Sequence, residues 1–195
     1  MRTIFSRYIL PIFVLIFSSQ AFAANTNPIV NRLVGTASIR GGNILQVGDE
    51  VPWGSRVILG AGGEIAVVAK GDFAAKAWGP AELKIRKTTK TKSTWLSLLY
   101  GRLITAFQHG KGAAVSTPTS VAGVRGTVVY VEDGPELQDY HCTCEGTVDH
   151  RHLKDVNVKR TVHSTHHDQP LLMKKGQLEL AKMLNHNDDD VNESI

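Results

Sequence analysis

Short apolar runs separated by glycine-containing turns recur along the chain and constrain its fold more than any other feature. The runs are rich in β-branched and aromatic residues, and their spacing of about 8 to 12 residues is typical of sandwiches, jelly rolls and wound β structures. The predicted strands include residues 33–40, 44–47, 56–59, 64–69, 73–78 and 82–86. The sequence therefore predicts a single all-β domain of short strands. Strand–helix–strand alternation and a glycine-rich phosphate loop are both missing from it, which argues against a nucleotide-binding fold.

A longer apolar segment, residues 95–107, follows a polar loop rich in lysine and threonine. Gly101 lies at its centre, and a glycine inside a strand favours a bend, so we expect either two paired strands or one bent strand. Large aromatic side chains could line a ligand groove, but so few of them in one domain are more typical of a core. We assign to the core Trp53, Trp78, Trp95 and Phe107.

Arg125 lies between two glycines, directly before the apolar run of residues 128–131. A guanidinium in such apolar surroundings needs carboxylate or carbonyl partners if it is withdrawn from water. We therefore interpret Arg125 as a structural hydrogen-bond anchor rather than a ligand contact. The residues that we expect to have a structural role in this segment are Gly123, Arg125, Gly126 and Thr127.

The same segment resembles the signature of a known family. The order Val115-Ser116-Thr117-Pro118, then Ala122-Gly123-Val124-Arg125-Gly126-Thr127, is similar to that of the FecR-type domains, and the likeness extends over residues 29–148. The resemblance implies an exported bacterial β-rich domain. The iron–citrate regulators that name the family add a cytoplasmic helical segment that binds a sigma factor, and a membrane span. We expect no sigma-regulator activity here, and the resemblance then implies a free-standing exported binding or scaffold module.

Residues 1–23 have the organisation of a secretory signal peptide, with basic residues first, an apolar stretch next and Ala21-Phe22-Ala23 as the cleavage site. Loss of Arg2 and Arg7 lowers the formal net charge from +4 to +2. The remaining basic cluster at residues 84–92 has no interleaved aromatics, which argues against nucleic acid as a partner. We expect a periplasmic or secreted protein that does not span the membrane after cleavage and that could bind another envelope protein.

Six of the eight histidines and both cysteines lie between residues 140 and 170. Residues two apart in a strand face the same way, so Cys142 and Cys144 would present both sulfurs on one side. His166 and His167 precede a turn-favouring run, and a hairpin would bring them to the cysteines. We predict a metal site of these four residues, with Asp168 as a ligand or as the partner of a ring N–H. Thiolate and imidazole suit a zinc, copper or iron ion, with haem less favoured.

Three other interpretations of the same residues stay open. A Cys142–Cys144 disulfide, formed in an oxidising compartment, would leave a purely structural or protein-interaction domain. The histidines could be solvated loop residues, which we expect for His150, His152 and His163. A thiol nucleophile with an imidazole base would need free cysteines, and two exported thiols so close together tend to oxidise, so we expect no enzyme.

Near the end of the chain, the sequence predicts a last strand and turn at residues 171–177, then a short helix at 178–184. Three consecutive aspartates, residues 188–190, are interpreted as a disordered end rather than a calcium loop. The predicted organisation is thus a leader at 1–23, a FecR-like β domain at 24–148, a Cys/His-rich extension at 149–177 packing on that domain, and a short helix with a polar tail at 178–195.

Overall fold

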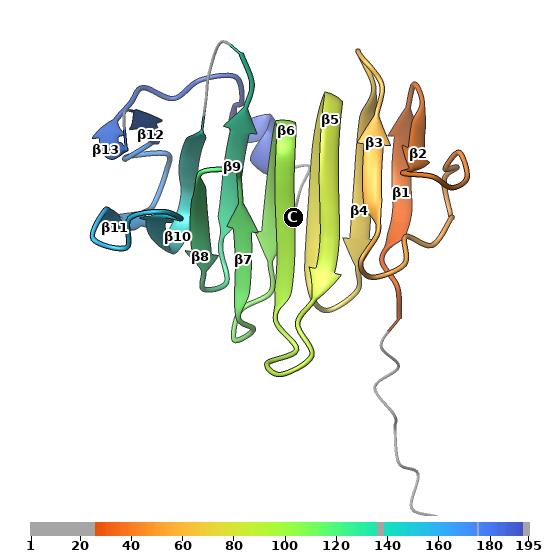
Figure 1. Cartoon of the computed structure of the whole chain (residues 1–195), viewed down its shortest axis with the longest axis horizontal. Helices are drawn as coiled ribbons and strands as arrows, with labels where there is room; N and C mark the ends of the chain where they lie inside the picture. The colour runs from red at the N-terminus through yellow and green to blue at the C-terminus, as the bar shows by residue number, and fades with distance from the viewer. Residues whose placement is uncertain (1–25, 136–138, 175, 193–195) are drawn as a thin grey trace, which may run out of the picture.

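The computed structural model describes residues 26–135, 139–174 and 176–192, and the predicted leader at residues 1–23 lies outside them. The described residues form an all-β domain with one short helix, as predicted (Figure 1). The elements in chain order are β1 (Ile29–Val34), β2 (Ala37–Ile39), β3 (Arg56–Leu59), β4 (Glu64–Ala69), β5 (Phe73–Lys87), β6 (Thr94–Phe107), β7 (Ala113–Ser116), β8 (Ser120–Val124), β9 (Val128–Asp133), β10 (Tyr140–His152), β11 (Lys159–Ser164), β12 (Leu171–Lys174), β13 (Gln177–Leu180) and α1 (Asp188–Asn192).

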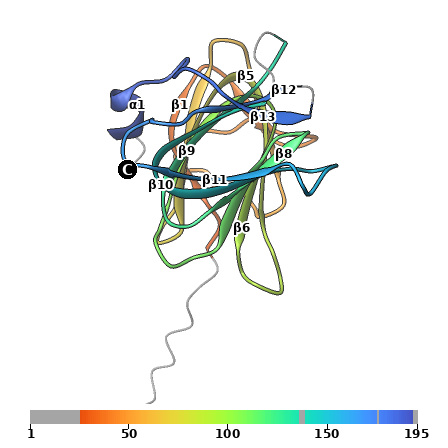
Figure 2. The same cartoon turned by 90° about the vertical axis from the view of Figure 1, so that its left-hand side faces the viewer.

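Three long strands, β5, β6 and β10, change partners along their length and so join two rows of strands (Figure 2). One row runs β1-β4-β5-β6-β9-β10-β12-β13. The other row runs β2-β3-β5-β6-β7-β8-β10-β11. All pairs are antiparallel except β6 with β7, which are parallel. The sheet is therefore folded double, like a sandwich with continuous corners.

The corners coincide with glycines inside the long strands. Gly101 of β6 has a φ of +106°, and a Cβ there would lie 2.4 Å from the Cβ of Ala81. Gly146 of β10 has a φ of +94°, and a Cβ there would lie 2.6 Å from the Cβ of Thr127. Only glycine fits such a conformation at such a close approach. Of the two alternatives for residues 95–107, the single bent strand is the one found.

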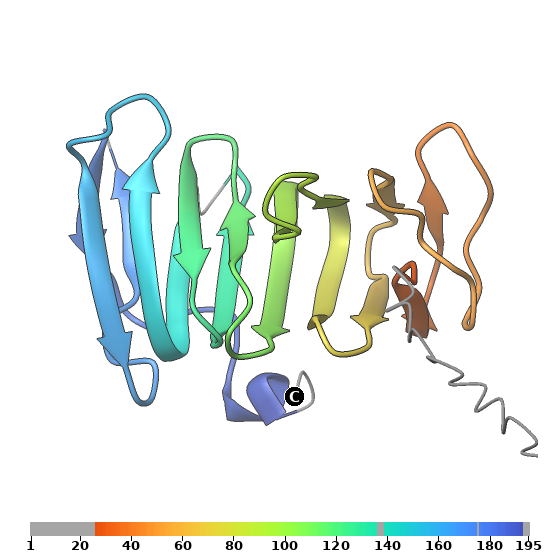
Figure 3. The same ribbon diagram turned by 90° about the horizontal axis from the view of Figure 1, so that it is seen from below.

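The main hydrophobic core lies between the two rows, and a smaller apolar cluster covers part of the outside. Tyr130, Tyr140 and Ile104 belong to this outer cluster, together with both cysteines. Residues 181–192, here called the C-terminal strap, pack on it through Ala181 and Val191. Figure 3 shows α1, the end of the strap, lying outside the row of strands. The sheet is thus buried on both faces at this point.

The predicted core aromatics are placed as follows. Phe107 is buried in the main core, and Trp53 packs half-buried against it. Trp78 packs half-buried against the outer cluster. Trp95 is half-buried and donates its ring N–H to the hydroxyl of Ser116 at 3.0 Å.

The predicted helix at residues 178–184 is wrong. Residues 177–180 form strand β13, because Leu171 to Lys174 offer a free edge that they pair with. The helix comes later, in the run of aspartates that was expected to be disordered. The Asn187 side chain accepts from the backbone N–H of Asp190 at 3.1 Å and so caps its first turn, where acidic residues are favourable.

Three strand predictions also need correction. Residues 33–40 are divided between β1 and β2, because the chain turns at Gly35, whose φ is +74°. Residues 73–78 and 82–86 belong to one strand, β5, which continues through Gly79 and Pro80. Residues 44–47 form no strand, since Ile44 makes only an isolated bridge to Ser38. Ile44 is 72% exposed and Val47 is 61% exposed, so their apolar character does not mark a core position.

The Arg125 guanidinium has a carboxylate partner, but it stays in contact with water. Its side chain is 75% exposed and donates to the carboxylate of Asp149 at 3.0 Å, so the anchor is a surface ion pair. Thr127 is buried, and Gly126 approaches His109 too closely for a side chain. No helical segment within residues 26–135, 139–174 and 176–192 has the length and apolar character that a membrane span requires.

Candidate metal centre

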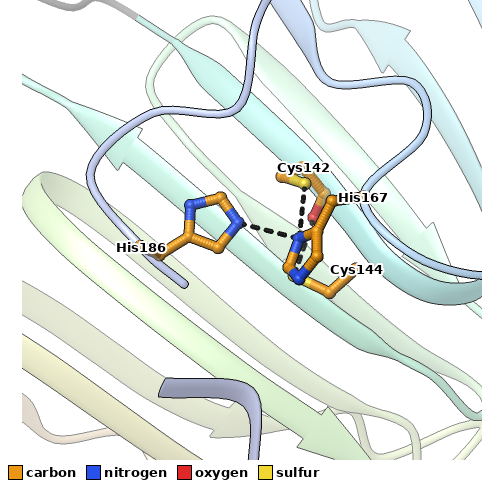
Figure 4. A group of neighbouring side chains, drawn as sticks. All are labelled: Cys142, Cys144, His167 and His186. Carbon is orange, nitrogen blue, oxygen red and sulfur yellow. Dashed lines mark hydrogen bonds between the residues drawn. The ribbon is translucent and has the colours of Figure 1, made fainter. Parts of the chain in front are cut away.

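Four buried side chains converge on the outer face of β10 (Figure 4): Cys142, Cys144, His167 and His186. Their sulfur and ring-nitrogen atoms all lie within 4.8 Å of one another. Two sulfurs and two imidazole nitrogens are a common ligand set for tetrahedral metal ions in proteins. The cluster could therefore hold a transition metal ion.

Strand β10 supplies both sulfurs. Cys142 and Cys144 lie on the same face of the strand as Tyr140, at 0% and 2% exposure. Both cysteines are unbridged. Strand β11 pairs with β10 from Gly146 opposite Ser164, so the loop after β11 returns over the cysteines. The predicted hairpin that brings the two segments together is confirmed.

The loop after β11 directs His167 at the sulfurs. The backbone N–H of His167 donates to the carbonyl of Cys144 at 3.1 Å, and its Nδ1 lies 3.3 Å from the Sγ of Cys142. The φ of His167 is +50°, an uncommon conformation for a residue with a side chain. Asp168 holds this turn by accepting from the backbone N–H of Thr165 at 3.1 Å. The local backbone thus fixes the imidazole over the cysteines.

The C-terminal strap brings in His186. The Tyr140 hydroxyl donates to the carbonyl of Lys182 and accepts from the N–H of Leu184, both at 3.1 Å. The ring of His186 stacks on Tyr130 with centroids 4.1 Å apart and planes 10° apart. Two tyrosines of the sheet therefore position the strap histidine.

Each histidine has a hydrogen-bond acceptor at its outer nitrogen. The Nδ1 of His186 lies 2.6 Å from the carbonyl oxygen of Leu184, and the Nε2 of His167 lies 3.2 Å from a carboxylate oxygen of Asp188. If these outer nitrogens donate, the Nε2 of His186 and the Nδ1 of His167 carry lone pairs, and these two atoms lie 3.2 Å apart. Two lone pairs so close repel unless a proton or a cation lies between them. A carbonyl or carboxylate on the outer nitrogen is typical of metal-bound histidine.

The electrostatics of the cluster keep a proton on one sulfur. The pKa of the Cys144 thiol is raised by its hydrogen bond with Cys142 and by burial, against the opposite effect of His186. The pKa of His167 is lowered by burial and by the neighbouring His186 and His166. Burial alone would lower the pKa of His186, but hydrogen bonds with Cys144 and the Leu184 carbonyl raise it overall. A metal ion would have to displace the Cys144 proton, as is usual for thiolate sites.

Three of the five predicted metal residues converge: Cys142, Cys144 and His167. The His166 side chain is 69% exposed, and its Nε2 lies 3.7 Å from Asp188 in a separate, mostly exposed group that shares His167. Asp168 caps the turn instead of facing the sulfurs.

Sequence reasoning missed His186, because it lies in a tail expected to be partly disordered. Its only signal in the sequence is the neighbouring Asn187, a residue that favours helix N-caps and hence an ordered segment.

The prediction that His150 is a solvated loop residue is wrong. Strand β10 extends to residue 152, and His150 is 2% exposed with its Nε2 3.0 Å from the hydroxyl of Thr143. His152 is half-buried near the strand end. His163 is exposed as predicted, on β11, with its Nδ1 2.9 Å from the hydroxyl of Thr147.

A second buried polar cluster lies on the inner side of β10, around Asp139. Its carboxylate accepts from Thr117 at 2.6 Å, from Ser120 at 2.5 Å and from Thr119, and lies 2.8 Å from the Nε2 of His141. The hydroxyl of Ser120 also lies 2.8 Å from the same Nε2. A catalytic Ser–His–Asp triad uses the two different ring nitrogens, so this arrangement is a structural network.

Comparison with known proteins gives a likeness of fold. No family model matches the chain, and no curated protein matches it. Two crystal structures, at 1.65 and 2.50 Å resolution, of a "putative anti-sigma factor" from Parabacteroides distasonis match with a TM-score of 0.55 and 11% identity. Each match covers 70% of this chain and 62% of the other. At this identity the likeness shows that the two proteins share a fold.

Proposed function

We propose that this protein is an exported, FecR-like β scaffold that holds one transition metal ion through Cys142, Cys144, His167 and His186. One observation carries the metal: the inward nitrogens of two buried histidines face each other at 3.2 Å, while their outer nitrogens already have acceptors. The signature around Arg125 and the fold likeness to a protein described as an anti-sigma factor support the scaffold. The leader-like residues 1–23 support export.

Zinc(II) fits the ligand set best. Zn²⁺ with two thiolates and two neutral imidazoles has no net charge, which lowers the cost of burying the site. Copper(I) with the same ligands would leave one uncompensated negative charge. Iron(II) would also be neutral, but it binds a given nitrogen and sulfur site more weakly than zinc does.

The role that the site supports is structural rather than catalytic. Four protein ligands complete a tetrahedral shell, whereas catalytic zinc keeps a position for water or substrate. The ligands come from β10, from the loop after β11 and from the C-terminal strap, which are far apart in the chain. The metal would fasten the strap and the loop onto the outer face of the sheet.

The test is metal analysis of protein purified from the periplasmic fraction. We expect one zinc per chain, two thiols that titrate only after metal removal, and a mature N-terminus near Ala24. His186→Gln should reduce zinc affinity at least 100-fold, because it removes a ligand and leaves a three-ligand site. His166→Gln is the matched control, since this neighbouring imidazole points away from the sulfurs, and it should change affinity less than threefold.

Cobalt(II) offers an independent readout, because tetrahedral thiolate coordination gives strong visible and near-ultraviolet absorption. We expect these bands in the wild type and in His166→Gln, and their loss in Cys142→Ser. Equal loss of zinc in the two histidine variants would refute the ligand assignment. Protein without metal and without titratable thiols before reduction would instead identify the disulfide-bonded alternative.

A further inference from the structure

A surface hollow of about 580 Å³ lies over strands β8, β10 and β11, in the row of strands opposite the metal site. It is lined by Gly123, Asp149, His150, Arg151, Lys159, Arg160 and Thr161. This volume falls within the range of small-ligand sites in proteins, roughly 300 to 1,000 Å³.

Positive charges gather at this hollow without acidic partners. Arg151 and Lys159 are exposed and lie directly opposite each other in the β10–β11 register, and half-buried Arg160, the register partner of His150, also lines the hollow. Like charges directly opposite on neighbouring strands are destabilising. Within residues 26–135, 139–174 and 176–192, no carboxylate forms an ion pair with any of the three. The fold thus keeps a repulsive arrangement that an anion would relieve.

Among the described residues, Asp149 is the carboxylate that lines the hollow, and it is already engaged. Asp149 accepts from the hydroxyl of Thr161 at 2.7 Å and from the guanidinium of Arg125 at 3.0 Å. These two hydrogen bonds lower the pKa of Asp149, which therefore stays ionised and paired. Its charge is balanced by Arg125, so the net positive charge on the exposed face of the hollow comes from Arg151 and Lys159.

Gly123 has no side chain and so leaves the floor of the hollow open, although neither its backbone conformation nor its neighbours require a glycine. It lies inside β8, opposite Asp149, and its φ is not positive. An added Cβ would lie 3.6 Å from the carbonyl oxygen of Asp149, which is ordinary contact. Glycine inside a strand costs stability, and one role that justifies it is close approach of a ligand to the backbone.

We propose that this hollow binds an anionic ligand with at least two phosphate or sulfate groups. Arg151 and Lys159 would each contact one group, Arg160 would add charge at the edge, and the ligand body would lie over Gly123. Arg is suited to such oxyanions because its planar fork donates two parallel hydrogen bonds. The site is separate from the metal centre and does not depend on it.

The test is isothermal titration of the full mature chain with inorganic pyrophosphate and with a heparin-derived sulfated disaccharide, at 25 and 150 mM NaCl. The Arg151→Gln/Lys159→Gln double variant should weaken binding at least tenfold. Lys70→Gln/Lys90→Gln is the matched control, because it removes the same charge from exposed positions elsewhere, and it should change affinity less than twofold at 150 mM NaCl. Gly123→Val should keep the melting temperature within a few degrees and weaken binding at least tenfold.

The two probes distinguish the sources of the anion. Tighter binding of pyrophosphate assigns the site to phosphate ligands, and tighter binding of the disaccharide assigns it to sulfated saccharides. The proposal is overturned if neither probe binds at millimolar concentration. It is also overturned if the control variant loses as much affinity as the double variant, because binding would then depend on net charge alone.

Discussion

The two sides of β10 bury histidines in opposite ways. On the inner side, His141 and three hydroxyls surround the carboxylate of Asp139, which therefore has its donors within the chain, while the buried Nδ1 of His141 has no partner among the described residues. On the outer side, two imidazoles and two sulfurs meet with no carboxylate among them, and the nearest one, Asp188, lies on the far nitrogen of His167. The inner cluster thus contains its own acidic group, whereas the outer cluster could take its counter-charge from a metal ion.

One strand produces both clusters because its side chains alternate. Tyr140, Cys142 and Cys144 face out, and His141 and Thr143 face in. The register with β9 shifts between Thr143 and Glu145, which returns His150 to the inner side next to His141. Buried polar groups that pair within the chain stabilise it without a ligand, whereas the proposed metal would stabilise the outer cluster by binding to the folded state.

The largest expected effect is that of removing the metal from the outer side of β10. A chelator should lower the free energy of unfolding by about 4 kcal/mol relative to protein with free zinc at 1,000 times its Kd. Urea unfolding with and without chelator measures this difference. Cys144→Ser should abolish the chelator effect. Hydrogen exchange should show the loss in residues 181–192 and not around Asp139. Unfolding that is insensitive to chelator would contradict a structural metal.

The next largest effect concerns the inner side. Asp139→Ala should destabilise the fold by about 3 kcal/mol, because it leaves His141 and the surrounding hydroxyls buried without their acceptor. Zinc affinity should stay within threefold of the wild type. The matched control is Asp155→Ala, a change at an exposed loop carboxylate. The two clusters are not independent if Asp139→Ala also abolishes metal binding.

A smaller effect is expected from removing the hydrogen bonds between Tyr140 of the sheet and the C-terminal strap. Tyr140→Phe removes the hydroxyl that binds Lys182 and Leu184 and keeps the ring, so it should cost about 1 to 2 kcal/mol. It should also weaken zinc binding several-fold, since the strap carries His186. Tyr100→Phe, at a residue that is 39% exposed, is the control. The strap is held by other contacts if the two variants have the same metal affinity.

The sequence predicted the sheet and three of the four clustered residues for the same reason: both follow from local pattern. Alternation along β10 placed Cys142 and Cys144 together, and a hairpin brought His167 to them. His186 could not be predicted, because its position depends on tertiary contacts with Tyr130 and Tyr140. The burial of His150 was missed because the length of β10 depends on its pairing with β8 and β11.

The smallest expected effect is a pH dependence of the inner side. Burial, and then the neighbouring His141, hold the pKa of His150 well below its usual 6.5. The folded state therefore keeps His150 neutral, while the unfolded chain takes up a proton as the pH falls through about 6.5. Protonation of His150 therefore stabilises the unfolded state. The free energy of unfolding has its full value above that pH, and it is about 0.8 kcal/mol lower at pH 6. His150→Gln can still bond Thr143 and should remove this part of the slope. His163→Gln, on an exposed strand position, should leave the slope unchanged, and identical slopes in both variants would show that His150 titrates normally.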